Sequence, residues 1–263
     1  MSSGWSVIAV RYGTLETTRS EAYYRYHSYG EPDGPQVLDY YFWIVRRGDE
    51  TILVDTGFDP DVGRRRGRTC LIEPAEAMAV LGVGPETVSR VVLTHLHYDH
   101  TGNLDLFPDA ELLVAARDLD FWLGPLARRA QFAHTVEAEE LGQVLAAVDA
   151  GRVRRLEGGE EIAEGIHAIL LGGHSPGQLA IGIDAVAGWT VLASDALHFY
   201  EELERDWPFG VVADLAEMYE GYDTLRELSG APGAHLVPGH DAEVMTRYPR
   251  VDGPAGEFAV EIR

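Results

Sequence analysis

The segment "LTHLHYDHTGN", Leu93 to Asn103, concentrates histidine and aspartate in the pattern His95-x-His97-x-Asp99-His100. Neutral imidazole and carboxylate are the usual protein ligands of zinc and related divalent cations. Side chains at alternate positions of an extended segment point the same way, so His95 and His97 can bind one cation together. Asp99 and His100 follow at the bend and can face a second cation a few ångströms away. The pattern therefore predicts two half-built metal sites in one loop.

The pattern is too specific to be a chance grouping of surface histidines. The chain has 10 histidines. At that frequency, the number of such matches expected by chance is on the order of one in a thousand. We therefore interpret the segment as metal-binding and look for the ligands that it lacks.

A metal ion needs about four to six donor atoms, and this loop offers at most two side chains for each ion. Three further candidates follow β-rich runs: His174 in Gly-Gly-His-Ser-Pro-Gly, Asp195 in Ala-Ser-Asp, and His240 in Pro-Gly-His. Small neighbouring residues let the backbone approach closely at such positions. Each residue alone could be a cap or a turn residue, but together they complete a ligand set.

Strands predominate among the elements that must position these ligands. Two β-rich runs, 40–45 and 51–54, form a predicted hairpin that ends at Asp55-Thr56-Gly57. The order of elements lacks the strict alternation of a doubly wound sheet, which favours an α/β fold of packed sheets with helices outside. No repeat or linker divides the chain, so we expect a single domain over residues 1–263. The other expected elements are strands at 91–94, 166–171, 179–183, 190–193 and 235–237, helices at 74–81 and 215–228, and a helical stretch over 117–149 with breaks at Gly124-Pro125 and Gly142.

The composition narrows the choice of partners. Hydrophobic residues make up 46% of the chain and charged residues 24%, which is typical of a globular protein. The 21 basic and 43 acidic residues give a net charge of −22, which repels phosphate backbones and anionic membranes. We therefore expect a small-molecule substrate, no nucleic acid and no membrane partner. A homodimer stays open.

The expected compartment is the cytoplasm. Cys70 is the single cysteine, so no internal disulfide can form, as is usual in a reducing compartment. The apolar run at 5–10 has no basic residue before it, unlike a secretory signal. No stretch approaches the roughly 18 uninterrupted apolar residues that span a bilayer.

The ligand residues and their spacing resemble the metallo-β-lactamase-fold hydrolases over about residues 40–240. The resemblance implies an αββα four-layer sandwich of two mixed β-sheets flanked by helices, with two metals in a cleft at one sheet edge. Asp55 resembles the aspartate of the family that orients a ligand histidine and fixes its tautomer. Position by position, the resemblance implies that the first ion is held by His95, His97 and His174, the second by Asp99, His100 and His240, and that Asp195 bridges them.

The implied cofactors are two divalent metal ions, with zinc as first choice and manganese, iron or cobalt as alternatives. Coordination lowers the pKa of bound water to about 7, so a bridging hydroxide is available at neutral pH. A carbonyl above the metals can take its attack and place the developing oxyanion against a cation. The implied chemistry is hydrolysis.

Two features favour the lactonases within this family: the residue at position 195 and the short segment that follows His240. A cysteine at position 195 would suggest the zinc β-lactamases, but Asp195 stands there. The chain ends soon after His240, where glyoxalase-II-like thioesterases carry a helical domain. What remains resembles the N-acyl-homoserine lactonases and related lactonases, and this resemblance implies that a lactone is opened. Alternatives are hydrolysis of another ester, a thioester or a cyclic amide, an iron-dependent persulfide dioxygenase, and a non-enzymatic metal-stabilised subunit.

One position departs from the homoserine lactonases. They carry tyrosine three residues after the bridging aspartate, where this chain has His198. Imidazole can donate to a carbonyl or protonate an alkoxide, so we assign His198 a catalytic role, with a simple packing role as the alternative. Tyr200 is a weaker substitute. Asp99 is the second catalytic candidate, because it could pass a proton to the leaving alkoxide in addition to binding metal.

Three further segments remain to be placed. The aromatic runs "DLDFWLGPLARRAQF" (118–132) and "HFYEELERDWPFGVV" (198–212) could roof the cleft and supply an apolar pocket, or belong to the ordinary core. The tyrosine-rich run at 21–32 could be a cap or a dimer contact. The basic run at 64–68 is interpreted as a solvated turn.

Overall fold

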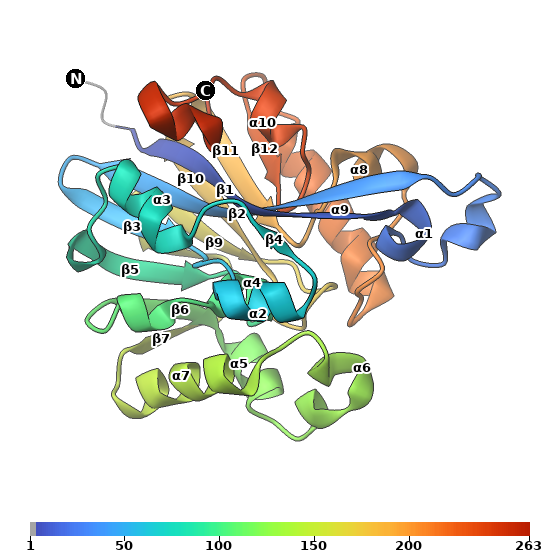
Figure 1. Cartoon of the computed structure of the whole chain (residues 1–263), viewed down its shortest axis with the longest axis horizontal. Coiled ribbons are helices and arrows are strands. Elements are labelled where there is room, and N and C mark those ends of the chain that lie inside the picture. Colours follow the sequence, from blue (N-terminus) through green and yellow to red (C-terminus); the bar gives the residue numbers. More distant parts are fainter. Residues whose placement is uncertain (1–3) are drawn as a thin grey trace.

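Two mixed β-sheets form the centre of the computed structural model, which describes residues 4–263 (Figure 1). The larger sheet has the order β13-β1-β2-β3-β5-β6-β7, and β4 pairs with β1. Its strands are β1 Ser6–Thr18, β2 Pro35–Arg47, β3 Glu50–Val54, β4 Thr69–Cys70, β5 Val88–Leu93, β6 Glu111–Ala115, β7 Val153–Leu156 and β13 Ala259–Glu261. The smaller sheet has the order β12-β11-β10-β9-β8, formed by β8 Glu160–Ala163, β9 Ile166–Leu170, β10 Leu179–Ala185, β11 Gly188–Ser194 and β12 His235–Pro238.

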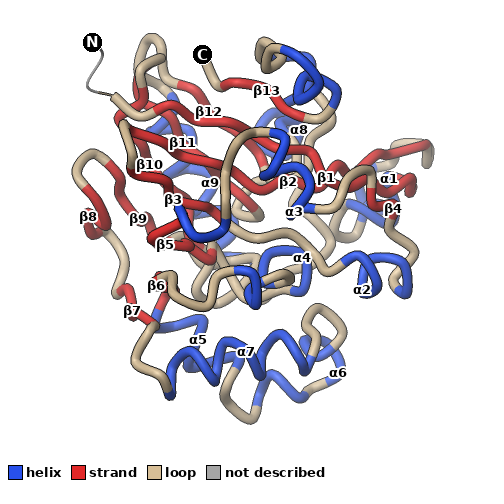
Figure 2. The backbone as a smooth tube through the Cα atoms, turned by 60° about the vertical axis from the view of Figure 1, so that its left-hand side comes forward, coloured by secondary structure: helices blue, strands red, loops and turns tan. Residues whose placement is uncertain are grey.

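Helices cover the outer faces of both sheets. In Figure 2, α5, α6 and α7 lie together at the end of the larger sheet where β6 and β7 run. The α-helices are α1 Arg19–Ala22, α2 Pro60–Arg65, α3 Pro74–Val80, α4 Tyr98–Thr101, α5 Ala116–Trp122, α6 Ala130–Ala133, α7 Ala138–Asp149, α8 Tyr200–Arg205, α9 Leu215–Ser229 and α10 Val244–Arg247. Short 3-10 helices lie at η1 Tyr26–Tyr29, η2 Pro85–Thr87, η3 Leu104–Leu106, η4 Leu126–Arg128 and η5 Gly253–Glu257.

Strand alternation divides the core into layers. In β1, Val7 and Ala9 belong to the apolar cluster between the two sheets, which also contains Ile181 and Leu192 of the smaller sheet. Val10, on the other face of β1, packs in the cluster that joins the larger sheet to its helices. A third cluster joins the outer face of the smaller sheet to α9. Because successive strand residues point to opposite faces, this arrangement gives the predicted αββα order.

The predicted strands and helices are present, but one predicted break is absent, and further elements, among them β1, β6, β7 and β8, were not predicted. The predicted break at Gly142 is wrong, because α7 continues through it from Ala138 to Asp149. Gly142 has no heavy atom within 4 Å of its Cβ position, so it faces open space and the helix accepts it. The long strand β1 was not predicted, since its apolar run ends at Val10 and its remaining residues are mostly polar.

The strand ends determine where the chemistry lies. β3 and β5 are parallel neighbours, and so are β11 and β12, so their carboxyl ends lie at the same edges of their sheets. Asp55 follows β3 and His95 follows β5 within two residues, and Asp195 follows β11 directly. The sheets therefore bring residues distant in sequence to one edge. Within residues 4–263, no helix is long and apolar enough to cross a membrane.

Candidate metal centre

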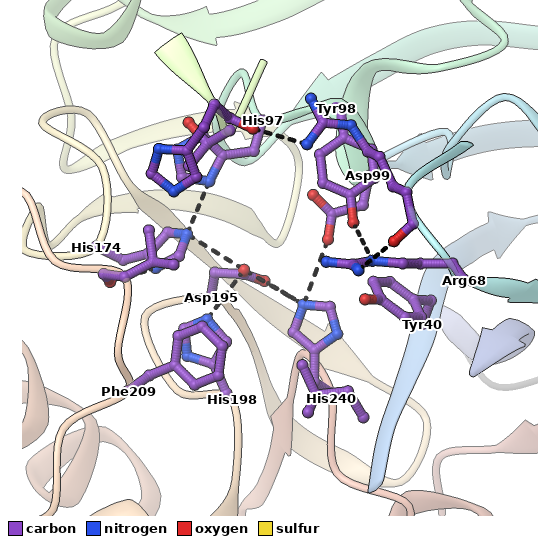
Figure 3. A pocket seen from close by; sticks show the side chains of 15 residues that line it. Tyr40, Arg68, His97, Tyr98, Asp99, His174, Asp195, His198, Phe209 and His240 are labelled. Carbon is purple, nitrogen blue, oxygen red and sulfur yellow. Dashed lines mark hydrogen bonds and ion pairs between the residues drawn. The ribbon is translucent and has the colours of Figure 1, made fainter. Parts of the chain in front are cut away.

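The structure brings all seven predicted ligands together in one buried cluster, in loops that follow β5, β9, β11 and β12 (Figure 3). Each of them has less than a tenth of its surface exposed. The expected ligand set is therefore spatially compatible with a metal centre. The seven ligand candidates are His95, His97, Asp99, His100, His174, Asp195 and His240.

The first group is formed by three histidines. The ligand atoms of His95, His97 and His174 all lie within 4.8 Å of one another. His97 Nδ1 lies 2.9 Å from His174 Nε2. Two nitrogen lone pairs repel each other at this distance unless a proton or a cation lies between them. The Nδ1 of His174 lies 3.0 Å from the carbonyl oxygen of Val211, so its Nε2 is directed into the cluster. His95 Nε2 is buried and has no hydrogen-bond partner among the described residues.

The second group is formed by Asp99, His100 and His240, again within 4.8 Å. His100 Nδ1 lies 2.7 Å from Asp55 Oδ2, and His240 Nδ1 lies 2.9 Å from the carbonyl oxygen of Asp39. In both rings an acceptor at Nδ1 fixes the tautomer that leaves the Nε2 lone pair for a metal. The histidines are thus oriented before any cation binds.

Asp195 lies between the two groups, with one oxygen toward each. Its Oδ1 is 3.2 Å from His100 Nε2 and 3.1 Å from His240 Nε2. Its Oδ2 is 3.3 Å from His174 Nε2 and 3.9 Å from His95 Nε2. A carboxylate placed in this way has one oxygen for each of two cations. The residues present therefore fit a pair of divalent ions.

Asp55 organises the base of the cluster, as the resemblance implied. It has a positive φ of 61° where the chain leaves β3, a conformation that is costly for a residue other than glycine. Its carboxylate accepts hydrogen bonds from the backbone N–H and the hydroxyl of Thr94, both at 2.8 Å. Ser194, also at positive φ, lies 2.8 Å from the same Thr94 hydroxyl. The ends of β3, β5 and β11 are thereby joined.

The pKa of His100 is shifted in the opposite direction from the pKa values of the first group. Burial holds the pKa of His95 and His174 well below the usual value and lowers that of His97 to about 3, so these rings are neutral and can donate a lone pair. Burial acts in the same direction on His100, but the carboxylates of Asp195, Asp55 and Asp99 outweigh it and raise its pKa well above 6.5. The carboxylates thus favour positive charge at this position, which is the charge that a metal cation supplies.

His198 lies against the cluster from the loop before α8. Its Nε2 is 3.1 Å from Asp195 Oδ2, and its ring stacks on Phe209 with centroids 3.6 Å apart. Burial alone would lower its pKa, but Asp195 and Glu202 outweigh burial and raise the pKa to about 9. The suggestion that Tyr200 could substitute for it is wrong, because the Tyr200 hydroxyl donates to the carbonyl oxygen of Leu236, 3.0 Å away.

Sequence reasoning missed two buried carboxylates that support the site. Asp118 accepts hydrogen bonds from the backbone N–H of Leu96 at 2.8 Å and of Gly177 at 2.9 Å, and so joins the loops that carry the first histidine group. Burial raises its pKa to about 6. Glu202 accepts from the backbone N–H of His198 at 2.7 Å and fixes the backbone there. An acid at a helix start is common in sequences, so neither position carried a signal.

Two adjoining cavities open onto the cluster. One, of about 190 Å³, is lined by Tyr40, Arg66, Arg68, Tyr98 and Phe209 together with several of the ligands. The run at 64–68 is therefore more than a solvated turn, and that interpretation is wrong for its two cavity-lining arginines. The second, of about 370 Å³, shares His97 and His174 with the first and is further lined by Tyr24, Trp122, Phe132, Val211 and Val212. Both predicted aromatic runs and the tyrosine-rich run thus reach the cavities.

Comparison with known proteins agrees with this geometry. The model of the metallo-beta-lactamase superfamily matches residues 36–240. The N-acyl homoserine lactonase AttM of Azorhizobium caulinodans is 24% identical over 176 residues, which cover 66% of this chain and 65% of that protein, just under two thirds of its length. A crystal structure of a quorum-quenching N-acyl homoserine lactone lactonase aligns with a TM-score of 0.78 at 20% identity, over 95% of this chain and 98% of that one. AidC, described as a dizinc quorum-quenching lactonase, aligns with a TM-score of 0.69 at 17% identity, over 100% of this chain and 95% of that one.

The chain belongs to the metallo-beta-lactamase superfamily. The αββα fold predicted from the sequence is confirmed. The chain's relatives and structural neighbours include lactonases, in agreement with the expected enzyme class.

Proposed function

We propose that this chain is a dinuclear metal-dependent hydrolase that opens a small lactone, with the N-acyl-homoserine lactones and related cyclic esters as the candidate rings. The observation that carries the proposal is the division of the Asp195 oxygens between two histidine-containing groups. The lactonases among its relatives and structural neighbours support the choice of ring. The dizinc description of AidC supports zinc.

Each ligand residue would contribute in a defined way. His95, His97 and His174 would hold one cation, Asp99, His100 and His240 the other, and Asp195 both. Two bound divalent cations supply a water that ionises near neutral pH and a positive charge beside the carbonyl oxygen. The hydrogen bonds that the histidines make outside the cluster, together with the burial of Asp195, would hold the two groups at a fixed distance from each other.

His198 and Asp99 are the residues that would handle the proton. Opening a lactone breaks the bond between the acyl carbon and the ring oxygen, and the departing alkoxide must receive a proton. His198 lines the cavity beside Asp195, where a protonated ring could donate to the departing alkoxide. Asp99 lines the same cavity and can relay a proton as well as bind metal. Phe209 stacks on His198 and excludes water from one face of its ring.

A substrate panel tests this function. Protein loaded separately with zinc, manganese or iron is offered acyl-homoserine lactones, simple γ-lactones, aromatic lactones, thioesters and cyclic amides. We expect the highest kcat/KM on a lactone. Two bound metals without turnover of any cyclic ester would overturn the lactone assignment, and oxygen uptake with glutathione persulfide would replace it with an oxidoreductase.

A further inference from the structure

Arg68 is a cation without an acidic partner in the wall of the first cavity. Arg66, two residues earlier, also lines the cavity, but its Nε lies 2.8 Å from Glu137 Oε1, which neutralises it. Arg68 instead donates from Nε to the Tyr98 hydroxyl at 2.9 Å and from Nη1 to the carbonyl oxygen of Arg66 at 2.5 Å. No Asp or Glu of residues 4–263 forms an ion pair with it, and its side-chain neighbours in the cavity wall are the phenols of Tyr98 and Tyr40. The guanidinium charge is therefore left for another group.

The side chain lies where a bound substrate would lie. Arg68 is half-buried and shares the cavity with Asp99 and His240 of the second ligand group. Figure 3 shows it extending beside Tyr40 toward these two residues. The carboxylate of Asp99 is directed to His100 and His240, at 3.8 and 3.9 Å, rather than to the guanidinium.

Half-burial of a cation costs free energy, because the charge loses part of its hydration without gaining an acidic partner. The planar guanidinium fork matches the two oxygens of a carboxylate. The Tyr98 oxygen accepts from Arg68, and the Tyr98 hydroxyl is itself hydrogen-bonded to that of Tyr40, so the two phenols hold the guanidinium in place. Nη1 and Nη2 carry two N–H bonds each, so guanidinium donors remain for an anion in the cavity.

We propose that Arg68 binds a carboxylate of the substrate, so that the preferred substrates are small lactones that bear a carboxylate on the ring. The proposal rests on the lactone hydrolysis proposed above. The protein's net charge of −22 works against an anionic substrate, so the attraction has to come from the site itself. The cavity volume of about 190 Å³ suits a small ring with a short substituent.

The test compares two substrates and two variants. The substrates are 5-oxotetrahydrofuran-2-carboxylate and its uncharged primary amide, which share one ring. Replacing Arg68 by glutamine is expected to raise KM for the carboxylate by about ten- to hundredfold with kcat nearly unchanged, because a charge-assisted contact is lost. KM for the amide should not change. Arg64→Gln is the matched control, since Arg64 is 76% exposed and paired with Asp61 outside the cavity.

A binding measurement separates this proposal from the reaction. The lactam 5-oxopyrrolidine-2-carboxylate has the same shape, and calorimetry with zinc-loaded protein should show binding that weakens about ten- to hundredfold in Arg68→Gln and partly recovers in Arg68→Lys. Circular dichroism and thermal unfolding of each variant establish that it is folded. Equal KM values for carboxylate and amide in the parent protein, or equal losses for both in Arg68→Gln, would overturn the anion site. Arg68-dependent lactam binding without hydrolysis of either lactone would support the site and overturn the lactonase proposal.

Discussion

The base and the wall of the first cavity are built in different ways. The base consists of the seven metal-ligand candidates, which are buried and follow strand ends, with outer contacts such as Asp55 and Asp39 fixing the histidine rings. The wall includes Arg66, Arg68 and Tyr98, of which the two arginines are partly exposed and lie in a loop after α2. In the proposed function, the base carries out the reaction and the wall selects the substrate. Substitutions in the base should lower turnover of every substrate, whereas those in the wall should change the ranking of substrates.

The largest effect is expected at Asp195. In Asp195→Asn, an oxygen of the shared carboxylate becomes an amide, so both groups lose negative charge and one cation loses a ligand. We expect kcat/KM to fall by at least about 10³-fold for every lactone, with metal content reduced, because several kcal/mol of charge stabilisation disappear. Steady-state kinetics and elemental analysis measure the two effects.

The matched control for that substitution is Asp184→Asn, an exposed aspartate at the end of β10 that lies outside both cavities. It should retain the activity and metal content of the parent. Full turnover by Asp195→Asn would mean that this carboxylate does not hold the cations.

A smaller loss is expected at His198, which lies between base and wall. In His198→Gln we expect kcat to fall about 10²-fold on lactones, the usual contribution of a positioned proton donor, while metal content stays at the parent level. Loss of metal together with activity would assign His198 to the ligands instead. A lactone with a more acidic leaving alcohol should restore part of the rate, because it needs less help from a proton donor.

A substitution at Asp55 tests how far the base depends on the hydrogen bonds that orient its histidine rings. Asp55→Asn keeps the size of the side chain but weakens the acceptor at His100 Nδ1, 2.7 Å away. We expect metal affinity to fall about 10- to 100-fold, measured by competition with a chelator. Substrate ranking should stay as in the parent, in contrast to Arg68→Gln. A change of ranking would show that base and wall are not separable.

The base could be predicted from the sequence because its chemistry is local. His95, His97, Asp99 and His100 occur within six positions, and the remaining ligands follow recognisable β-rich runs. The wall could not be predicted, because the role of Arg68 depends on packing against a residue thirty positions away. The pairing of Arg66 with Glu137 likewise joins segments that no local pattern connects.

The same limit explains the errors in the fold. Glycine weakens helices on average, so Gly142 signalled a break, yet α7 continues through it at an open position. The outer half of β1 has the polar composition of a loop and is held as a strand by its register with β2, from Leu15 opposite Leu38 to Thr18 opposite Pro35. Cross-strand partners of this kind appear only in three dimensions.

The smallest expected effect is on the unfolding free energy of the protein, and it comes from a buried carboxyl group behind the base. Glu140 of α7 is buried, its Oε2 accepts from the hydroxyl of Thr101 at 3.1 Å, and burial raises its pKa to about 8. A raised carboxyl pKa contributes stability below the unfolded value, near 4.5, and that contribution is lost as the pH rises through 8. Glu140→Gln should remove this loss, so that unfolding free energy between pH 5 and 9 falls less than in the parent, by on the order of 2 kcal/mol.

Denaturant unfolding at fixed metal concentration measures this difference. The exposed neighbour Glu139, changed to glutamine, is the control and should follow the parent curve. Identical pH profiles for Glu140→Gln and the parent would show that Glu140 is ionised in the folded protein.

Anomalous diffraction from crystals grown with zinc tests the central claim most directly. Two peaks are expected, one against His95, His97 and His174 and one against Asp99, His100 and His240, with an Asp195 oxygen beside each. A single peak, or none at saturating zinc, would contradict the two-cation centre.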